Sequence, residues 1–256
     1  MKSKSSDYVL FGVDFSSNEG QKELIRNIRI DHTIKPVVFC VGSAGTGKTF
    51  AALAGALGEV RGYGGNHKKY KNIYYVREPV EIGHRLGYLK GTEEDKYAPY
   101  LGPLLDNYLH LMAFASKKGE DKSNLYLKRK ESDGELPFMY SRLPSDIIPL
   151  APEFLRGRSF DDCIIIVDEA QNLTLDELQT LVTRIGSFCK MIIIGSPNQI
   201  DIPGQSEENN DFMTAYKILE PTGLVSLIKL ESPMRSSFVV DFDLRFTEYK
   251  EKKRKK

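Results

Sequence analysis

The chain contains no tryptophan, and it has only three cysteines and four histidines among its 256 residues. Cys40, Cys163 and Cys189 lie in or beside apolar runs, and no histidine is spaced from them as zinc ligands are. We therefore expect buried, reduced thiols rather than a disulfide framework or a zinc site. No apolar run approaches the length of a membrane span. The formal net charge of +1 excludes general attraction of nucleic acid, so any basic binding surface must be local.

What is present indicates a folded protein. A hydrophobic content of 41% excludes a disordered chain, and the length suffices for one well-packed α/β domain or two small ones. The first four residues are polar and no hydrophobic segment follows them. With no secretory signal visible, we expect a cytoplasmic protein.

Six short apolar runs, rich in isoleucine and valine, predict strands that are buried on both faces of a parallel sheet. They are residues 37–41, 73–76, 147–150, 164–167, 191–194 and 225–230. Helical segments separate several of them, which favours stacked βαβ units in a single doubly wound α/β domain. The clearest helix follows the fourth run: Thr174 and Glu177 form a capping box, an apolar stripe continues to Ile185, and Gly186 is expected to end the helix.

The most informative motif follows the first run and has the pattern G-x-x-x-x-G-K-[ST]. Its residues are Gly42, Ser43, Ala44, Gly45, Thr46, Gly47, Lys48 and Thr49. An Ala-rich segment at 50–57 predicts a helix directly afterwards, so the motif has the strand–loop–helix setting of a phosphate-binding loop. Glycines and a helix N-terminus suit phosphate oxygens. Lys48 would reach the β- and γ-phosphates of ATP, and the Thr49 hydroxyl would ligate Mg²⁺.

Two acids follow the buried run at 163–167, as in a Walker B motif. Asp168 would hold Mg²⁺, usually through water, and Glu169 would orient and deprotonate the attacking water. Ligands of open α/β sheets bind at this edge of the sheet. A pair of acids that merely caps a strand is the alternative, which the phosphate loop disfavours.

Three further residues are weaker candidates. Gln199 follows the run at 191–194 and could contact the γ-phosphate, although its surroundings also suit a plain turn. Arg235 could stabilise charge on the transferred phosphoryl group, but a surface arginine is equally plausible. Gln21 lies before the first strand and could read adenine with its amide, or it could be an exposed helix residue.

The chain divides into an N-terminal segment (1–35) that carries Gln21, an ATPase core (36–248) and a basic tail (249–256). A charged insertion at about 117–135 and a glycine-rich basic loop at 61–71 interrupt the core. The tail is expected to be disordered. It is either a solvated end or an electrostatic arm for nucleic acid.

Several longer stretches resemble the PhoH family, ATPases related to superfamily-one helicases, over most of the chain. They are 77–83 with 86–91, 151–160, 181–186 and 199–203. The phosphate loop and the Asp-Glu-Ala-Gln sequence are shared widely among such helicases. These stretches, in the correct order, are more specific. The resemblance implies a single RecA-like P-loop NTPase domain with a mainly parallel sheet flanked by helices.

The resemblance also implies ATP hydrolysis, a link to RNA and a ring of identical subunits, commonly a hexamer. It supports Gln21 and Gln199 in the roles given above. It makes Arg156, Arg158, Arg184 and Arg235 candidates, one of which would act in a neighbouring subunit. By analogy with helicases, a segment that starts with Arg77, Glu78 and Pro79 lies where single-stranded nucleic acid is contacted.

Two departures bear on these expectations. Ser196 stands where the family usually has an acid, which would make turnover slower or more dependent on Glu169. The stretch at 117–135 is longer than its counterpart, and the chain is too short for the PIN nuclease domain fused in some relatives. An ATP-gated RNA-binding or assembly module with slow hydrolysis is therefore the alternative to an ATPase that remodels RNA. An RNA-cleaving activity has weak support.

Overall fold

A computed structural model describes residues 5–63, 67–78, 98–118, 143–152, 157–197, 199, 209–232, 234 and 245. Within these residues, six parallel strands form one sheet in the order β5-β4-β6-β7-β3-β8. The strands are β3 (Val37–Gly42), β4 (Asn72–Arg77), β5 (Ile147–Leu150), β6 (Cys163–Asp168), β7 (Cys189–Gly195) and β8 (Val225–Leu230). All six predicted strands are confirmed, as is the α/β class.

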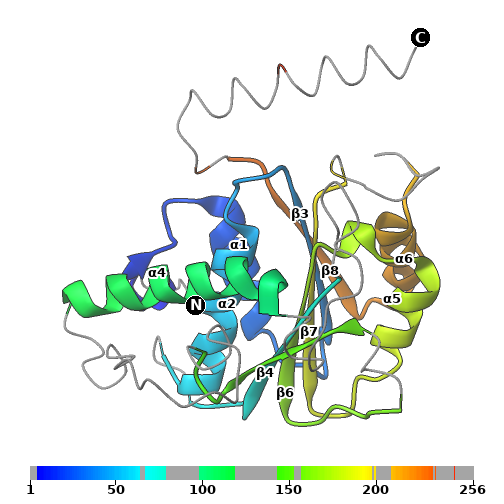
Figure 1. Cartoon of the computed structure of the whole chain (residues 1–256), viewed down its shortest axis with the longest axis horizontal. Helices are drawn as coiled ribbons and strands as arrows, with labels where there is room; N and C mark the ends of the chain where they lie inside the picture. Colours follow the sequence, from blue (N-terminus) through cyan, green and yellow to red (C-terminus); the bar gives the residue numbers. More distant parts are fainter. Residues whose placement is uncertain are drawn as a thin grey trace.

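Helices cover both faces of the sheet (Figure 1). On one face lie α1 (Glu19–Arg29), α2 (Lys48–Arg61) and α4 (Gly102–Lys118), and on the other lie α5 (Leu175–Val182) and α6 (Asp211–Leu219). Alternation along each strand builds the two cores. On β6, Ile164 and Ile166 pack beneath α2, whereas Ile165 and Val167 face α5 and α6. A two-residue hairpin, β1 (Val9–Leu10) with β2 (Val13–Asp14), lies outside the sheet.

The capping box of α5 is confirmed, but the helix is shorter than predicted. The Thr174 side chain accepts from the Glu177 amide, and α5 ends at Val182 rather than at Gly186. The chain leaves the helix because the backbone of Phe160 offers it strand-like pairing. Phe160 donates to the Arg184 carbonyl and accepts from the Gly186 amide at 2.8 Å, which places Ile185 in a parallel bridge with Phe160.

Other predictions have mixed outcomes. All three cysteines are buried free thiols, as expected. Of the predicted insertion at 117–135, residues 117 and 118 are the end of α4 and the remainder lies outside the described residues. The basic tail at 249–256 also lies outside them. No helix in the described ranges has both the length and the apolar character needed to cross a bilayer.

Lys190 is an exception to the apolar character of β7, because its side chain is fully buried. Its Nζ donates to the carbonyl oxygens of Ile30 at 2.8 Å and Lys35 at 2.5 Å, and so joins β7 to the connection between α1 and β3. Burial lowers the pKa of Lys190 from 10.5 to about 7. The ammonium is therefore disfavoured in the folded protein relative to the unfolded chain.

This shift predicts how stability depends on pH. Between pH 7 and 10.5 the unfolded chain binds more protons at Lys190 than the folded protein does, so the contribution of Lys190 to the free energy of unfolding rises with pH. The slope is at most about 1.4 kcal/mol per pH unit. Urea denaturation at pH 7, 8.5 and 10 should show wild type gaining stability relative to Lys190→Met. Parallel pH dependences of the two proteins would contradict the prediction.

Candidate nucleotide-binding site

The phosphate loop connects the carboxyl end of β3 to the first residue of α2, as the motif predicts. Gly45 and Gly47 have φ angles of 77° and 78°, a left-handed conformation that side chains strain. At Gly47 a Cβ atom would also lie 2.5 Å from Nε2 of Gln21. Glycine is therefore favoured at position 47 by its backbone conformation, and a side chain there would also displace the Gln21 amide. The loop brings its backbone to the N-terminus of α2, where amides and the helix dipole favour an anion.

Lys48 folds back over this loop. Its Nζ donates to the carbonyl oxygens of Gly42 and Ser43, both at 2.8 Å, and the residue is only 8% exposed. Neutral carbonyls are weaker acceptors for an ammonium than phosphate oxygens are. A phosphate group in the loop would therefore be a better partner for Lys48 than those two carbonyls.

Asp168 is the last residue of β6. It is only 3% exposed, and several hydrogen-bond donors hold its carboxylate. Oδ1 accepts from the Thr49 hydroxyl at 3.0 Å and from the Glu169 amide at 3.1 Å. Oδ2 accepts from the Tyr75 hydroxyl at 2.6 Å. Burial, together with the Asp168 charge, raises the pKa of Tyr75 well above its usual value, so Tyr75 stays a donor. These bonds fix the direction of the Asp168 carboxylate.

Arg77 lies beside both acids. Its NH1 is 3.5 Å from Asp168 Oδ2, and its NH2 is 3.7 Å from Glu169 Oε1. Burial disfavours its charge, but the interactions with Tyr75 and Asp168 prevail and raise the pKa of Arg77. The guanidinium therefore remains a cation that balances the acid pair.

Gln171 connects Glu169 to the end of the next strand. Its Nε2 donates to Glu169 Oε2 at 2.6 Å and to the Gln199 carbonyl at 3.2 Å. Its Oε1 accepts from the Ser196 amide at 2.9 Å. Glu169 has a φ angle of 55°, which is rare for a residue with a side chain. A bonded network and an unusual backbone thus set the direction of Glu169.

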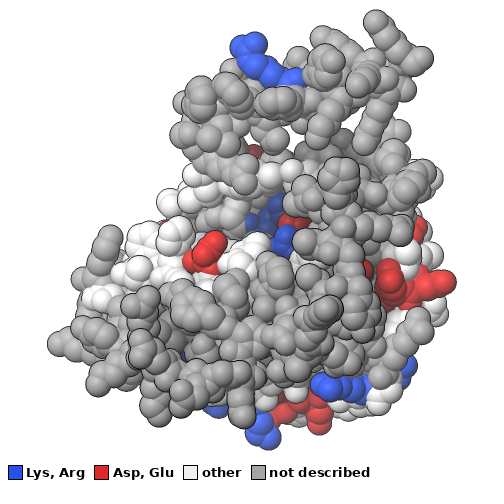
Figure 2. All heavy atoms as spheres, in the orientation of Figure 1, with Lys and Arg blue, Asp and Glu red and all other residues white. Residues whose placement is uncertain are grey.

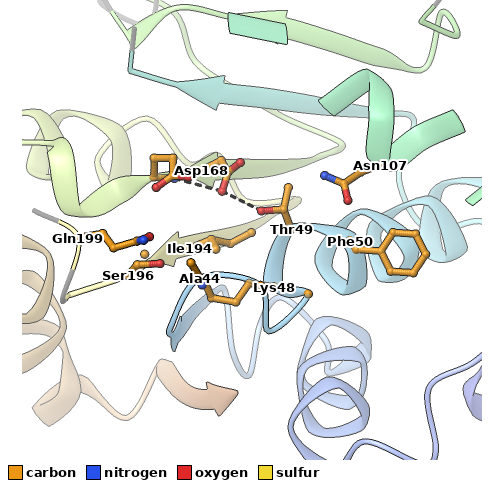
Figure 3. A pocket seen from close by; sticks show the side chains of 13 residues that line it. Ala44, Lys48, Thr49, Phe50, Asn107, Asp168, Ile194, Ser196 and Gln199 are labelled. Atoms are coloured by element: carbon orange, nitrogen blue, oxygen red, sulfur yellow. Dashed lines mark hydrogen bonds between the residues drawn. The ribbon is translucent and has the colours of Figure 1, made fainter. Parts of the chain in front are cut away.

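These groups border one cavity of about 410 Å³ (Figure 3). The phosphate loop and α2 line one side, and the ends of β6 and β7 line the other. The lining residues are Ala44, Gly45, Gly47, Lys48, Thr49, Phe50, Asn107, Asp168, Glu169, Ile194, Gly195, Ser196 and Gln199. The Thr49 hydroxyl and the Asp168 carboxylate are adjacent oxygen donors, the type that Mg²⁺ prefers. The residues present therefore fit a phosphate-bound magnesium ion.

Eight of the predicted site residues line this cavity: Ala44, Gly45, Gly47, Lys48, Thr49, Asp168, Glu169 and Gln199. Gly42, Ser43 and Thr46 belong to the loop without lining the cavity. Gln21 is also absent from the lining. It is 3% exposed, and its Nε2 donates to the Thr46 carbonyl at 3.0 Å. The position of Gln21 is that of a support for the phosphate loop, and adenine recognition stays a prediction.

Of the four predicted arginines, the structure describes Arg158 and Arg184, and neither lines this cavity. Arg158 is exposed, and Arg184 adjoins the pairing with Phe160, at the amino-terminal edge of the sheet. Asp168 stands at the opposite edge. Glu78 is described but does not line the cavity. Pro79, Arg156 and Arg235 lie outside the described residues.

Sequence reasoning gave no role to Tyr75, Gln171, Phe50 or Asn107. Tyr75 meets Asp168 only because β4 pairs with β6, a register that no local pattern reveals. Asn107 comes from α4, which the sequence analysis did not single out. Gln171 could have been found, since it is a polar residue that follows Glu169 by only two positions.

Comparison with known proteins shows the family of the chain. A family model described as PhoH-like protein matches residues 15–242. The chain belongs to the PhoH family. It is 37% identical over 199 residues to Protein PhoH2 of Bacillus subtilis, covering 77% of this chain and 40% of that protein. It is 34% identical over 197 residues to a PhoH-like protein of Mycobacterium tuberculosis, covering 77% of this chain and 48% of that protein. It is 28% identical over 221 residues to Protein PhoH of Escherichia coli, covering 86% of this chain and 54% of that protein.

The chain thus spans about half the length of these curated PhoH relatives. Among solved structures it is similar to the large terminase of a thermophilic bacteriophage, with a TM-score of 0.46 and 11% identity over 83% of this chain and 45% of the terminase. It is also similar to an arterivirus helicase, with a TM-score of 0.34 and 15% identity over 82% and 37% of the two chains.

The contact between Tyr75 and Asp168 predicts a specific defect. Tyr75→Phe removes a hydrogen bond to a charged group, and loss of such a supporting bond weakens metal sites by about 10- to 100-fold. Calorimetric titration with ADP and Mg²⁺ should therefore show at least about tenfold weaker binding. Tyr74→Phe is the control, because Tyr74 packs against Phe160 on the other face of the sheet. Equal affinities of the two variants would contradict the role of Tyr75.

Proposed function

We propose that this PhoH-family domain hydrolyses ATP with Mg²⁺ and couples hydrolysis to binding or remodelling of single-stranded RNA. The observation that carries the proposal is the placement of Lys48 and Thr49 and of Asp168 and Glu169 around one cavity. A phosphate loop that carries a lysine and faces two acids suits a triphosphate. A phosphate loop without the two acids would suit any phosphate.

Each residue has a part in this proposal. Loop amides and Lys48 bind the β- and γ-phosphates, and Thr49 and Asp168 hold Mg²⁺. When bound, Mg²⁺ would neutralise charge on the phosphate oxygens. Glu169 orients water and takes its proton. Gln199, which reaches the same cavity from the end of β7, contacts the γ-phosphate.

RNA is proposed because the chain belongs to the PhoH family and because a segment predicted to contact nucleic acid begins at Arg77 and Glu78. Where Figure 2 draws charged side chains, basic and acidic atoms are interspersed, in keeping with a net charge of +1. Binding would therefore depend on a local contact, to which the tail at 249–256 contributes as an arm. Affinity for RNA should fall steeply as salt rises, because phosphate neutralisation releases counterions.

Ser196 favours a second candidate, an ATP-gated binding or assembly module. It lines the cavity where the family usually has an acid, and its amide is bonded to Gln171. Fewer acids near the water would slow hydrolysis, so that bound ATP would set conformation and turnover would only reset it.

Turnover measurements distinguish the two candidates. Glu169→Gln should keep ATP affinity but lower the hydrolysis rate at least about 100-fold, since general-base catalysis contributes about 10²–10⁴-fold. Lys48→Ala should lose nucleotide binding as well. Wild-type turnover should rise when single-stranded RNA is added. Turnover that neither responds to RNA nor depends on Glu169 would reject the enzyme and leave the gated module.

We further propose a ring of identical subunits, a hexamer in the favoured case, in which one subunit supplies an arginine to its neighbour. The candidates are Arg156, Arg158, Arg184 and Arg235. Arg184 lies at the opposite edge of the sheet from Asp168. This position is compatible with action at the nucleotide site of a neighbouring subunit rather than at the site of its own subunit. One domain alone lacks the second fold that helicases close around ATP, so helicase activity on RNA would need adjacent subunits.

Mixing variants tests this assembly. Arg235→Ala subunits keep their own acids, and Glu169→Gln subunits keep their arginines. If hydrolysis uses an arginine in trans, mixtures of the two should regain part of the ATP turnover that each variant lacks alone. Arg158→Ala and Arg184→Ala are tested in the same way. Full activity of a strictly monomeric preparation would contradict the ring.

A further inference from the structure

Arg77 occupies a position that its predicted role in nucleic-acid contact does not explain by itself. It is the last residue of β4, directly opposite Asp168 on β6 in the strand register. Its side chain is 21% exposed rather than extended into solvent, and its two terminal nitrogens face different acids, NH1 at Asp168 and NH2 at Glu169. A residue at the border of the nucleic-acid segment thus contacts the group expected to activate water.

Glu169 is held from both sides in this arrangement. Oε1 faces the Arg77 guanidinium at 3.7 Å, and Oε2 accepts from Gln171 Nε2 at 2.6 Å. Of these two partners, Gln171 is buried and bonded to the end of β7, so its position is fixed. Arg77 is the partner that adjoins the predicted nucleic-acid segment. Its ion pair therefore restrains Glu169 from the side where RNA would arrive.

The ion pair between Arg77 and Glu169 is weak enough to exchange. At 3.7 Å, with Glu169 34% exposed, it belongs to the class of pairs that contribute little to stability. A nucleic-acid phosphate offers two oxygens that match the guanidinium fork and gives shorter, charge-assisted hydrogen bonds. A phosphate brought next to Arg77 would therefore compete successfully with the Glu169 carboxylate. Asp168 would keep its bonds to Thr49 and Tyr75 during this exchange.

We propose that Arg77 couples RNA binding to hydrolysis by restraining Glu169 until an RNA phosphate takes over its guanidinium. Arg77 is then a positioning residue that acts through Glu169. It holds the Glu169 carboxylate in the ion pair in the absence of RNA and frees it when RNA is bound. This inference rests on the proposed RNA-coupled ATPase and adds the residue that links its two activities.

The test compares Arg77→Gln with wild type, using ATP and a single-stranded RNA oligonucleotide. The variant should hydrolyse ATP without RNA about two- to fivefold faster than wild type, which corresponds to ~0.4–1 kcal/mol at 1.4 kcal/mol per tenfold. Its stimulation by RNA should fall close to onefold. In a fluorescence binding assay at several salt concentrations, the slope of log affinity against log salt should become shallower by about 0.7, the value for one lost phosphate contact on a single strand.

Two further variants control the comparison. Arg26→Gln removes a mostly exposed arginine of α1 that pairs only with Glu23 in the described part of the chain, and it should leave both the stimulation and the salt slope unchanged. Arg77→Lys keeps the charge next to Glu169 but loses the bidentate fork. It should keep the slow basal rate while its stimulation by RNA falls, and it tests the inference even if Arg77→Gln does not fold.

The outcomes separate the inference from the proposed function. If wild type shows RNA-stimulated turnover that depends on Glu169, the proposed function holds. The role of Arg77 would then be overturned if RNA stimulated hydrolysis by Arg77→Gln by the same factor as in wild type. The same holds if the variant had a lowered basal rate and kept that factor. An unchanged salt slope would overturn the phosphate contact. If wild type itself shows no such turnover, the proposed function fails first, and the inference fails with it.

Discussion

The hydrogen bond between Thr49 and Asp168 is the contact on which the site depends. It joins the first turn of α2 to the end of β6, although β7 separates β6 from the strand that leads into α2. Two strand spacings amount to about 10 Å, so the phosphate loop must pass over the end of β7 to bring Thr49 to Asp168. A wholly parallel sheet permits this, because the carboxyl ends of all its strands lie at one edge.

The same contact helps to satisfy a buried carboxylate with hydrogen bonds. An isolated carboxylate in the interior would be strongly destabilised, but donors from three parts of the chain converge on Asp168. They are the Thr49 and Tyr75 hydroxyls and the amide of Glu169, and Arg77 adds a positive charge. The donors that hold the acid also fix its direction. The constraint that stabilises the fold at this edge is therefore the one that prepares it for a ligand.

The sequence predicted the parts of this structure that depend on local pattern. Strands such as β3 and β6 are continuous apolar runs because both faces are buried, and the phosphate loop is recognisable because its glycines need special backbone angles. Parts that depend on strand order could not be predicted. Tyr75 reaches Asp168 only through the pairing of β4 with β6, and α5 ends early because Phe160 provides pairing from a distant segment. No single apolar run of the sequence indicates the order of the strands or their register.

A crystal structure with a non-hydrolysable ATP analogue and Mn²⁺ tests the central claim most directly, namely that one triphosphate is held between Lys48 and Asp168. The account predicts that anomalous signal from the metal lies beside Thr49 and Asp168. It also predicts that Lys48 Nζ has left the carbonyls of Gly42 and Ser43 for phosphate oxygens. A nucleotide bound elsewhere, or a Lys48 that keeps both carbonyl contacts with the nucleotide present, would contradict it.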